Sequence, residues 1–332
     1  MSIVLPAQKG CRYCNRERTP WVRSRPKTKG VVMLIATLSP HISFRKTVVL
    51  HPTVEALRFN TITSTGSKSK KQILVDLLEL CGKKPLWIDL KCRQLRVTKW
   101  GDPTFSAVEL SQKISVNLPA TIYFKDHRSK IVDIVDGNRL MLENEPKRPV
   151  GAGEAVNILD PSLVIEGYLT ESDSEYIEIA KEMDLHNYML SFVEETSDVG
   201  EVVKLDPKAS IVAKIESRRG LQFVKEQYSS MPSVRLMAAR DDLYINMGDH
   251  KEEIIASEKV IIQHDPTAIV ASRILTSLER DDEVSLSDLS DIHLLHLMGY
   301  RQFMLSDWIC RDSFAFGEAV GIFQRYQQRY QR

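Results

Sequence analysis

The segment Ser210–Glu216 has the sequence SIVAKIE, an apolar run that ends in two charged residues. A strand that is buried on both faces, as in a parallel sheet covered by helices, needs such a near-continuous apolar run. Seven more runs of this kind occur along the chain, with amphipathic stretches between them. Eight strand–helix units predict an α/β fold, a (β/α)8 TIM barrel. The predicted strands are Val31–Leu38, Ala56–Asn60, Pro85–Leu90, Asn187–Val193, Ser210–Glu216, Leu243–Met247, Thr267–Ser272 and Arg301–Ser306.

Helix signals lie between the apolar runs. Gln72–Cys81 places its apolar residues on one face of a helix, and Gly82 follows as a C-cap. Phe314–Tyr330 is predicted to be a last amphipathic helix. Two capping boxes, in which side chain and backbone bond reciprocally, mark further helix starts. These boxes pair Thr170 with Asp173 and Ser285 with Asp288.

The interval between about Arg93 and Asp160 breaks this rhythm with period-2 patterns and turn sequences. It predicts a small antiparallel β-domain inserted after the third barrel strand. Because barrel active sites lie at the carboxyl ends of the strands, such an insertion could act as a lid. Its predicted strands are Lys113–Val116, Thr121–Phe124, Ile131–Val135, Arg139–Glu143 and Ala155–Ile158. We expect an N-terminal arm at 1–29, the barrel at 30–93 and 161–332, and the inserted domain at 94–160.

Composition is that of an ordinary globular protein, with 43% hydrophobic and 27% charged residues. A net charge of +1 gives no global field that would attract nucleic acid or a membrane surface. No apolar run approaches the roughly 20 residues needed to cross a bilayer. Five cysteines in 332 residues do not make a disulfide framework. We therefore expect a reduced, cytoplasmic protein.

The segment 1–29 carries eight basic residues against one acidic residue and lacks a helical or alternating pattern. We interpret it as an extended arm that is solvated or packs in an interface, such as that of a homodimer. Cys11 and Cys14 form a lone C-x-x-C, and a zinc site needs a second pair. Zn²⁺ at Cys11 and Cys14, shared across a dimer, is the alternative to plain thiols. Cys81 and Cys92 are predicted to be buried thiols.

Polar residues stand at the ends of six predicted strands. Residues i and i+2 of a strand face the same side, so Arg58 and Asn60 point together, as do Lys214 and Glu216. One charged strand end is often only solvated, but six polar ends on one rim indicate a site, because buried charges need partners. The other polar strand ends are Asp89, Gly248-Asp249, Ser272 and Ser306.

The chemistry of these residues points to an anionic substrate and a divalent metal ion. Glu216 and Asp249 are hard oxygen ligands from neighbouring predicted strands, suited to Mg²⁺ or Mn²⁺. Lys214 and Arg58 could neutralise a transferring phosphoryl group or a developing enolate. The backbone N–H groups of Gly248 and Asp249 precede a predicted helix and suit a carboxylate. A small anionic oxo acid or its enol phosphate fits this combination.

In order and spacing, these residues resemble the motifs of the pyruvate kinase family across about residues 30–332. The most specific match is Ala213-Lys214-Ile215-Glu216-Ser217 with Gly220, which is similar to the K-I-E-N/S-x-x-G strand. Gly248-Asp249 is similar to the R-G-D-L-G turn. Further similarities pair Leu57–Asn60 with R-x-N-F-S-H, Ile88–Lys91 with L-D-T-K-G, Ala271–Leu275 with A-T-Q-M-L, and Met304–Ser306 with the start of M-L-S-G-E-T.

The resemblance implies a role for each matching residue. Glu216 and Asp249 would hold the divalent metal, and Gly248, Asp249 and Ser272 would contact the substrate. The implied catalytic residues are Lys214, which stabilises the transferring phosphoryl group, Arg58, which contacts phosphate, and Ser272, at the proton-transfer face of the enolate. Arg96 and Pro40 would contact the nucleotide, ADP or ATP. Asn60 and Asp89 would form half of a monovalent-cation site.

The sequence also departs from the family's motifs. Ile62 and Leu90 stand where the family has a serine and a threonine, so two oxygen ligands for K⁺ are missing. Met247 stands where the R-G-D-L-G turn has its arginine, and Asp307-Trp308-Ile309 replaces G-E-T. Glu154-Ala155 stands where the family has a lysine. These departures put K⁺ dependence and efficient nucleotide use in question.

The leading hypothesis is a divalent-metal-dependent enzyme that acts on phosphoenolpyruvate, pyruvate or a related 2-oxo acid. Phosphoryl transfer to a nucleoside diphosphate is the default reaction. One alternative is a lyase or decarboxylase of 2-oxo acids that uses the same enolate site without a nucleotide. Another is a non-catalytic protein that binds a metabolite or a partner. Retention of Lys214, Glu216 and Asp249 together argues against the non-catalytic alternative.

Overall fold

The computed structural model describes residues 32–63, 66–99, 107–124, 127–144, 149–229 and 231–330. The arm at 1–29 lies outside these ranges, so the predictions for Cys11 and Cys14 stay predictions. Within the described ranges, no helix is both long and apolar enough to cross a membrane. Cys81, Cys92 and Cys310 are buried free thiols, as predicted for Cys81 and Cys92.

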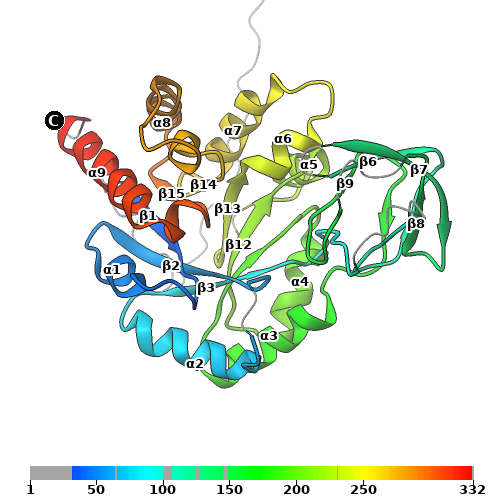
Figure 1. Ribbon diagram of the computed structural model, residues 1–332, viewed down its shortest axis with the longest axis horizontal. Coiled ribbons are helices and arrows are strands. Elements are labelled where there is room, and N and C mark those ends of the chain that lie inside the picture. The colour runs from blue at the N-terminus through cyan, green and yellow to red at the C-terminus, as the bar shows by residue number, and fades with distance from the viewer. Residues whose placement is uncertain are drawn as a thin grey trace, which may run out of the picture.

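Eight parallel strands close into a barrel, which confirms the predicted (β/α)8 architecture (Figure 1). The strands are nearly continuous apolar runs, and β3, β14 and β15 are buried at every position. Such burial on both faces is what the helices around a parallel barrel impose. In barrel order the strands are β1 (Met33–Thr37), β2 (Val54–Asn60), β3 (Leu86–Leu90), β11 (Asn187–Leu190), β12 (Ser210–Ile215), β13 (Val234–Ala239), β14 (Ile269–Ala271) and β15 (Gln302–Met304).

The helices cover the outside of the barrel and begin at the predicted caps. Thr170 and Asp173 form the capping box of α3, and the Ser285 side chain accepts from the Asp288 N–H at the start of α8. Gly82 is the C-cap of α2. The helices are α1 (Arg45–Leu50), α2 (Lys70–Cys81), α3 (Glu171–Glu182), α4 (Thr196–Leu205), α5 (Arg218–Glu226), α6 (Arg240–Asn246), α7 (Glu253–His264), α8 (Leu286–Met298) and α9 (Ser313–Tyr330), with short 3₁₀ turns η2 (Thr276–Glu279) and η3 (Ile309–Arg311).

The prediction of the sixth barrel strand was wrong. Leu243–Met247 lies almost entirely in α6, and the sixth barrel strand is β13, Val234–Ala239. Arg235 interrupts the apolar pattern of β13, but its guanidinium stacks over Trp87 and donates to Gln302 at 2.9 Å, so the strand tolerates it. The acidic pair in the first turn of α6 favours the N-terminus of a helix there.

The inserted module is an antiparallel sheet beside the barrel, at the right of Figure 1, with strand order β4-β8-β7-β6-β9. Its strands are β4 (Ala107–Glu109), β6 (Ala120–Tyr123), β7 (Arg128–Val135), β8 (Arg139–Leu142) and β9 (Asn157–Ile158). A second small sheet pairs β5 (Ile114–Ser115) with β10 (Val164–Ile165). The sequence did not predict β4 or β10, and β10 shows that pairing with the module continues past residue 160.

Deleting residues 94–160 is expected to leave a folded barrel and to lower any turnover by roughly 100-fold, because the loss would misplace groups at the barrel rim. The module has an apolar core of its own, built from residues such as Val108, Ile122, Ile131 and Leu140, separate from the barrel core. Far-ultraviolet circular dichroism and thermal unfolding of the deletion variant would check the fold. Loss of cooperative unfolding would contradict these domain boundaries.

Candidate functional site

A buried charge network occupies the carboxyl ends of β2, β3 and β12. Asp89, at 0% exposure, accepts from Arg58 Nε at 2.9 Å and from Lys214 Nζ at 3.1 Å. Lys91 Nζ, which the sequence did not single out, lies 3.4 Å from the same carboxylate. Burial alone would raise the pKa of Asp89, but Lys214, Lys91 and Arg58 together lower it well below its usual value. Asp89 therefore stays ionised and holds Arg58 and Lys214 as cations, whereas burial lowers the pKa of Lys91 to about 7.

Lys214 is placed between three oxygen atoms. Besides Asp89, it donates to Ser191 Oγ at 2.8 Å and lies 3.3 Å from Glu216 Oε1. Burial would lower the pKa of Lys214, but the charges of Asp89 and Glu216 outweigh it, and the net shift is upward. The side chain is therefore a fixed ammonium group and not a base at neutral pH.

Glu216 directly follows β12 and is 3% exposed. Its Oε2 accepts from the Phe192 N–H at 2.8 Å, and Phe192 has a left-handed φ of 49°. Such strained positions concentrate at functional sites. Burial raises the pKa of Glu216 to about 7, with Lys214 opposing this shift and Asp242 adding to it. Asp242 is therefore the neighbouring carboxylate that acts on Glu216.

Asp242 lies in the first turn of α6, directly after β13. It accepts from Gln94 Nε2 at 2.9 Å and from Asn157 Nδ2 at 3.1 Å. Gln94 lies on the segment that leads from β3 into the module, and Asn157 begins β9, the last strand of the module sheet along the chain. The module is thus connected to Asp242 both where the chain enters it and through its last strand. The preceding Asp241 is exposed and pairs with Arg273 instead.

Asp249 does not occupy the rim position that the sequence analysis gave it. That position depended on a strand at Leu243–Met247, which is helical, so Gly248 and Asp249 follow α6 and not a barrel strand. Asp249 is exposed, and Gly248 has a left-handed φ of 61° in the turn before α7. The acidic turn therefore follows α6, where Gly248 and Asp249 line the wall of a pocket beside the rim, and Asp242 takes the place after the sixth strand.

The remaining predicted residues lie around this centre. Ser272 directly follows β14 in a left-handed conformation with φ of 66°, and Ser306 donates to Glu279 at 2.5 Å. Arg96 donates to the Gly153 carbonyl at 2.6 Å and to Gln94, so Gln94 links it to Asp242. Pro40 borders Ser39 and His41, which line a hollow of about 490 Å³ together with Arg311.

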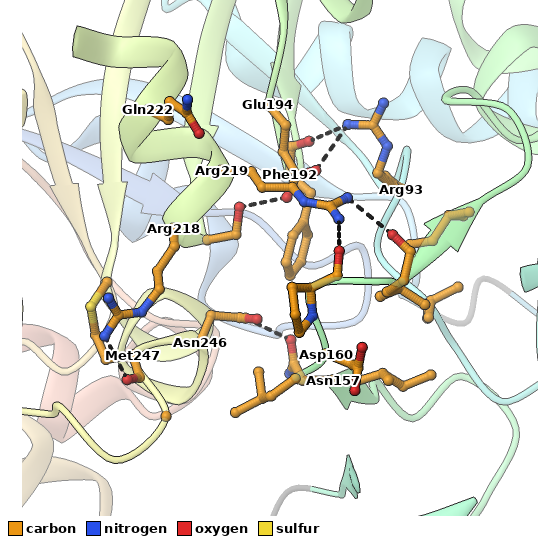
Figure 2. Close-up of a pocket in the computed structure, with 18 of the residues that line it drawn as sticks. Arg93, Asn157, Asp160, Phe192, Glu194, Arg218, Arg219, Gln222, Asn246 and Met247 are labelled. Atoms are coloured by element: carbon orange, nitrogen blue, oxygen red, sulfur yellow. Dashed lines mark hydrogen bonds and ion pairs between the residues drawn. The ribbon is translucent and has the colours of Figure 1, made fainter. Parts of the chain in front are cut away.

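A larger pocket of about 840 Å³ lies between the rim and the module (Figure 2). Figure 2 shows Arg219 bonded to main-chain carbonyls of the returning segment, at 2.7 Å from Pro161 and 3.0 Å from Leu163. Asn246 donates to Asn157 Oδ1 at 2.9 Å in the same wall. Because Asn157 also donates to Asp242, the pocket lies directly beside the carboxylate pair.

A sequence profile described as "Pyruvate kinase, barrel domain" matches residues 101–315, which is more than half of the chain. The chain belongs to the pyruvate kinase family. It is 22% identical over 279 residues to a pyruvate kinase of Methanocaldococcus jannaschii, covering 78% of this chain and 60% of that protein. It is 27% identical over 143 residues to a pyruvate kinase of Thermotoga maritima, covering 41% of this chain and 30% of that protein. The chain thus matches less than two thirds of the length of either relative.

The corrected sixth strand changes the residues that correspond to the family's R-G-D-L-G turn. Arg240-Asp241-Asp242-Leu243 directly follows β13 and matches the R-G-D-L part of the family's R-G-D-L-G turn at three positions of four. The residue that corresponds to the arginine of this turn is therefore Arg240 and not Met247. Its guanidinium is held by Glu258 and Asp291, each at 2.8 Å. An Arg-x-Asp-Leu run after an apolar stretch was the signal that could have located Asp242.

Activity is expected to be nearly equal in sodium and potassium buffers. Ile62 and Leu90 offer no side-chain oxygen, and the charge of Asp89 is already offset by Arg58 and Lys214, with Lys91 beside them. Both atoms of the Asn60 amide are also engaged, since its Nδ2 donates to Asp307 at 3.2 Å and its Oδ1 accepts from the Ile62 N–H at 3.4 Å. Steady-state rates at equal ionic strength would check this. Strong activation by K⁺ alone would show that a monovalent ion still finds a place beside Asp89.

Proposed function

We propose that the chain is an enzyme that stabilises the enolate of a small 2-oxo acid, with Mg²⁺ or Mn²⁺ held by Glu216 and Asp242. The observation that carries this proposal is the pair of neighbouring carboxylates at the barrel rim with the fixed ammonium group of Lys214 beside them. A (β/α)8 barrel collects its reactive groups at this rim.

The donor set fits a hard divalent cation. Glu216 and Asp242 supply carboxylate oxygens. Their hydrogen-bond donors, the Phe192 N–H and the Gln94 and Asn157 amides, are neutral and leave lone pairs free, and Lys214 lies beside Glu216 Oε1 at 3.3 Å. Within the described residues, no group of three or more His, Cys, Asp and Glu side chains could hold a metal alone. Substrate oxygens and water would therefore complete the coordination shell, as is usual for Mg²⁺.

Each protein group has a part in this chemistry. A bound divalent ion would supply a Lewis acid that polarises a substrate oxygen. Lys214 would offset the negative charge that develops on the substrate, because its own carboxylate partners keep it protonated. The Ser272 hydroxyl, directly after β14, would hold the proton that moves to or from the enolate carbon.

Phosphoryl transfer to a nucleoside diphosphate is the second candidate. The hollow lined by Ser39, His41 and Arg311 favours it, because this hollow adjoins Pro40 and could accept a nucleotide. Decarboxylation of a 2-oxo acid needs the same enolate centre and no nucleotide. A non-catalytic role gives no reason for the buried charges of Lys214 and Glu216 beside the half-buried Asp242.

Isothermal titration of oxalate, a stable mimic of the enolate of pyruvate, would test the proposal. Oxalate is expected to bind in the presence of Mg²⁺ and not in its absence. Assays with oxaloacetate, and with phosphoenolpyruvate and ADP, would then separate decarboxylation from phosphoryl transfer. Oxalate binding of equal strength with and without the metal ion would contradict the proposed centre.

Metal affinity is expected to depend on pH. The pKa of Glu216 is raised to about 7 by burial and by Asp242, and a metal ion binds only the ionised carboxylate. The affinity for Mn²⁺ should therefore fall by about tenfold per pH unit below pH 7 and level off above it. Mn²⁺ titrations followed by electron paramagnetic resonance would check this. A flat profile below neutral pH would exclude Glu216 as a ligand.

A further inference from the structure

The guanidinium group of Arg58 has almost no donor left for a ligand. Arg58 is 8% exposed, and its Nε and one terminal nitrogen donate to Asp89 Oδ2. The other terminal nitrogen donates to Thr37 Oγ1 at 3.0 Å and to Asp307 Oδ2 at 2.9 Å. Four of the five N–H groups of the side chain are thus used within the protein.

Asp307 is the second carboxylate that binds the guanidinium group of Arg58. It follows β15 on the loop into η3, at the position where the M-L-S-G-E-T motif has its glycine. Asp307 Oδ2 also accepts from Asn60 Nδ2 at 3.2 Å. Burial would raise the pKa of Asp307, but the charge and hydrogen bonds of Arg58 lower it overall, so the carboxylate is ionised. Arg58 therefore lies between two carboxylates, Asp89 and Asp307.

This arrangement opposes a phosphoryl group at Arg58. A phosphate oxygen would have to displace the Asp307 carboxylate from the guanidinium and would then lie beside its negative charge. The other oxygen of Asp307, Oδ1, is buried and has no hydrogen-bond partner among the described residues, so it adds an acceptor where a phosphate needs donors. The carboxylate of Asp307 thus takes the contact that a transferring phosphoryl group would need.

We infer that Asp307 is a specificity-determining residue that excludes phosphorylated substrates and restricts the site to unphosphorylated 2-oxo acids. The inference rests on the proposed enolate centre at Glu216 and Asp242 and names its substrate class. Asp307 acts through Arg58 and lies apart from the metal-binding carboxylates, so it changes which anion is accepted and leaves the metal-dependent step in place.

Asp307→Asn and Asp307→Gly test this inference. Asn keeps the size of the side chain and removes its charge, whereas Gly restores the residue of the family motif. With Mg²⁺ present, phosphoenolpyruvate and oxalate are titrated separately into the wild-type protein and each variant. The wild-type protein should bind oxalate and bind phosphoenolpyruvate at least about tenfold more weakly, and both variants should remove most of that difference.

Two controls separate specificity from a structural effect. Asp307→Glu keeps the charge and should keep the discrimination, and Asp282→Asn removes an exposed acid after η2 that does not touch Arg58. Equal affinity of the wild-type protein for both anions, or an unchanged affinity ratio in Asp307→Asn, would overturn the inference alone. Failure of oxalate to bind the wild-type protein with Mg²⁺ would overturn the proposed function, and the inference with it.

Discussion

Asp242→Asn is expected to remove most of the Mg²⁺-dependent binding of oxalate. The asparagine keeps the size of the side chain and an oxygen acceptor, but it removes one of the two negative charges that would hold the divalent ion. Loss of a group that only orients a metal ligand costs 10–100-fold in metal affinity, so loss of a ligand's charge should cost about 100-fold or more. Calorimetry with Mg²⁺ and oxalate measures the change.

Asp249→Asn is the matched control for this prediction. Asp249 is exposed and follows α6, so the substitution should leave oxalate binding within the range of the wild-type protein. The two variants also decide which residue is the second metal ligand. The candidates are Asp249, predicted from the sequence, and Asp242, which follows β13. A large loss in Asp249→Asn with none in Asp242→Asn would show that the metal is held at the turn after α6 and not at Asp242.

The sequence contained most of the barrel and most of the rim, because both depend on local patterns. Buried parallel strands are apolar throughout, and the rim residues Arg58, Asp89, Lys214 and Glu216 come directly at strand ends. The sequence did not predict β13, because Arg235 interrupts its apolar run. That arginine is stabilised by Trp87 and Gln302, which are distant in sequence, and no local pattern contains such contacts.

The residues that sequence reasoning missed are those that act through long-range contacts. Gln94 is 148 residues from Asp242, and Asp307 is 249 residues from Arg58. Neither residue has a local pattern of its own, and Asp307 was noticed only as a departure from a family motif. Only the closed barrel brings β15 next to β1 and so carries Asp307 to the end of β2. The specificity of the site is therefore a property of the fold and not of any single segment.

Lys214→Met is expected to separate the two candidate reactions. In phosphoryl transfer the ammonium group offsets charge on the moving group, and such a preorganised electrostatic contribution is worth ~10²–10³ in rate. In decarboxylation the metal ion already stabilises the enolate, so much of the rate should survive. Rates with phosphoenolpyruvate and ADP, and with oxaloacetate, are measured for the wild-type protein and the variant. Lys208→Met, at an exposed lysine just before β12, is the control for the substitution itself.

The expected binding change depends on pH. Lys214 Nζ lies 3.3 Å from Glu216 Oε1 and opposes the rise in the pKa of Glu216, so its removal should weaken oxalate binding with Mg²⁺ at neutral pH and leave it largely intact at alkaline pH, where Glu216 is ionised. Asp89 keeps Arg58 and Lys91 as partners, so the fold should persist, with a stability loss below the 3–5 kcal/mol of a fully broken buried pair. If oxalate binding at alkaline pH falls together with both rates, Lys214 positions the metal centre and does not act on the substrate. If the wild-type protein decarboxylates oxaloacetate and forms no ATP, the enolate centre stands and the kinase candidate is excluded, as the carboxylate of Asp307 beside Arg58 leads us to expect.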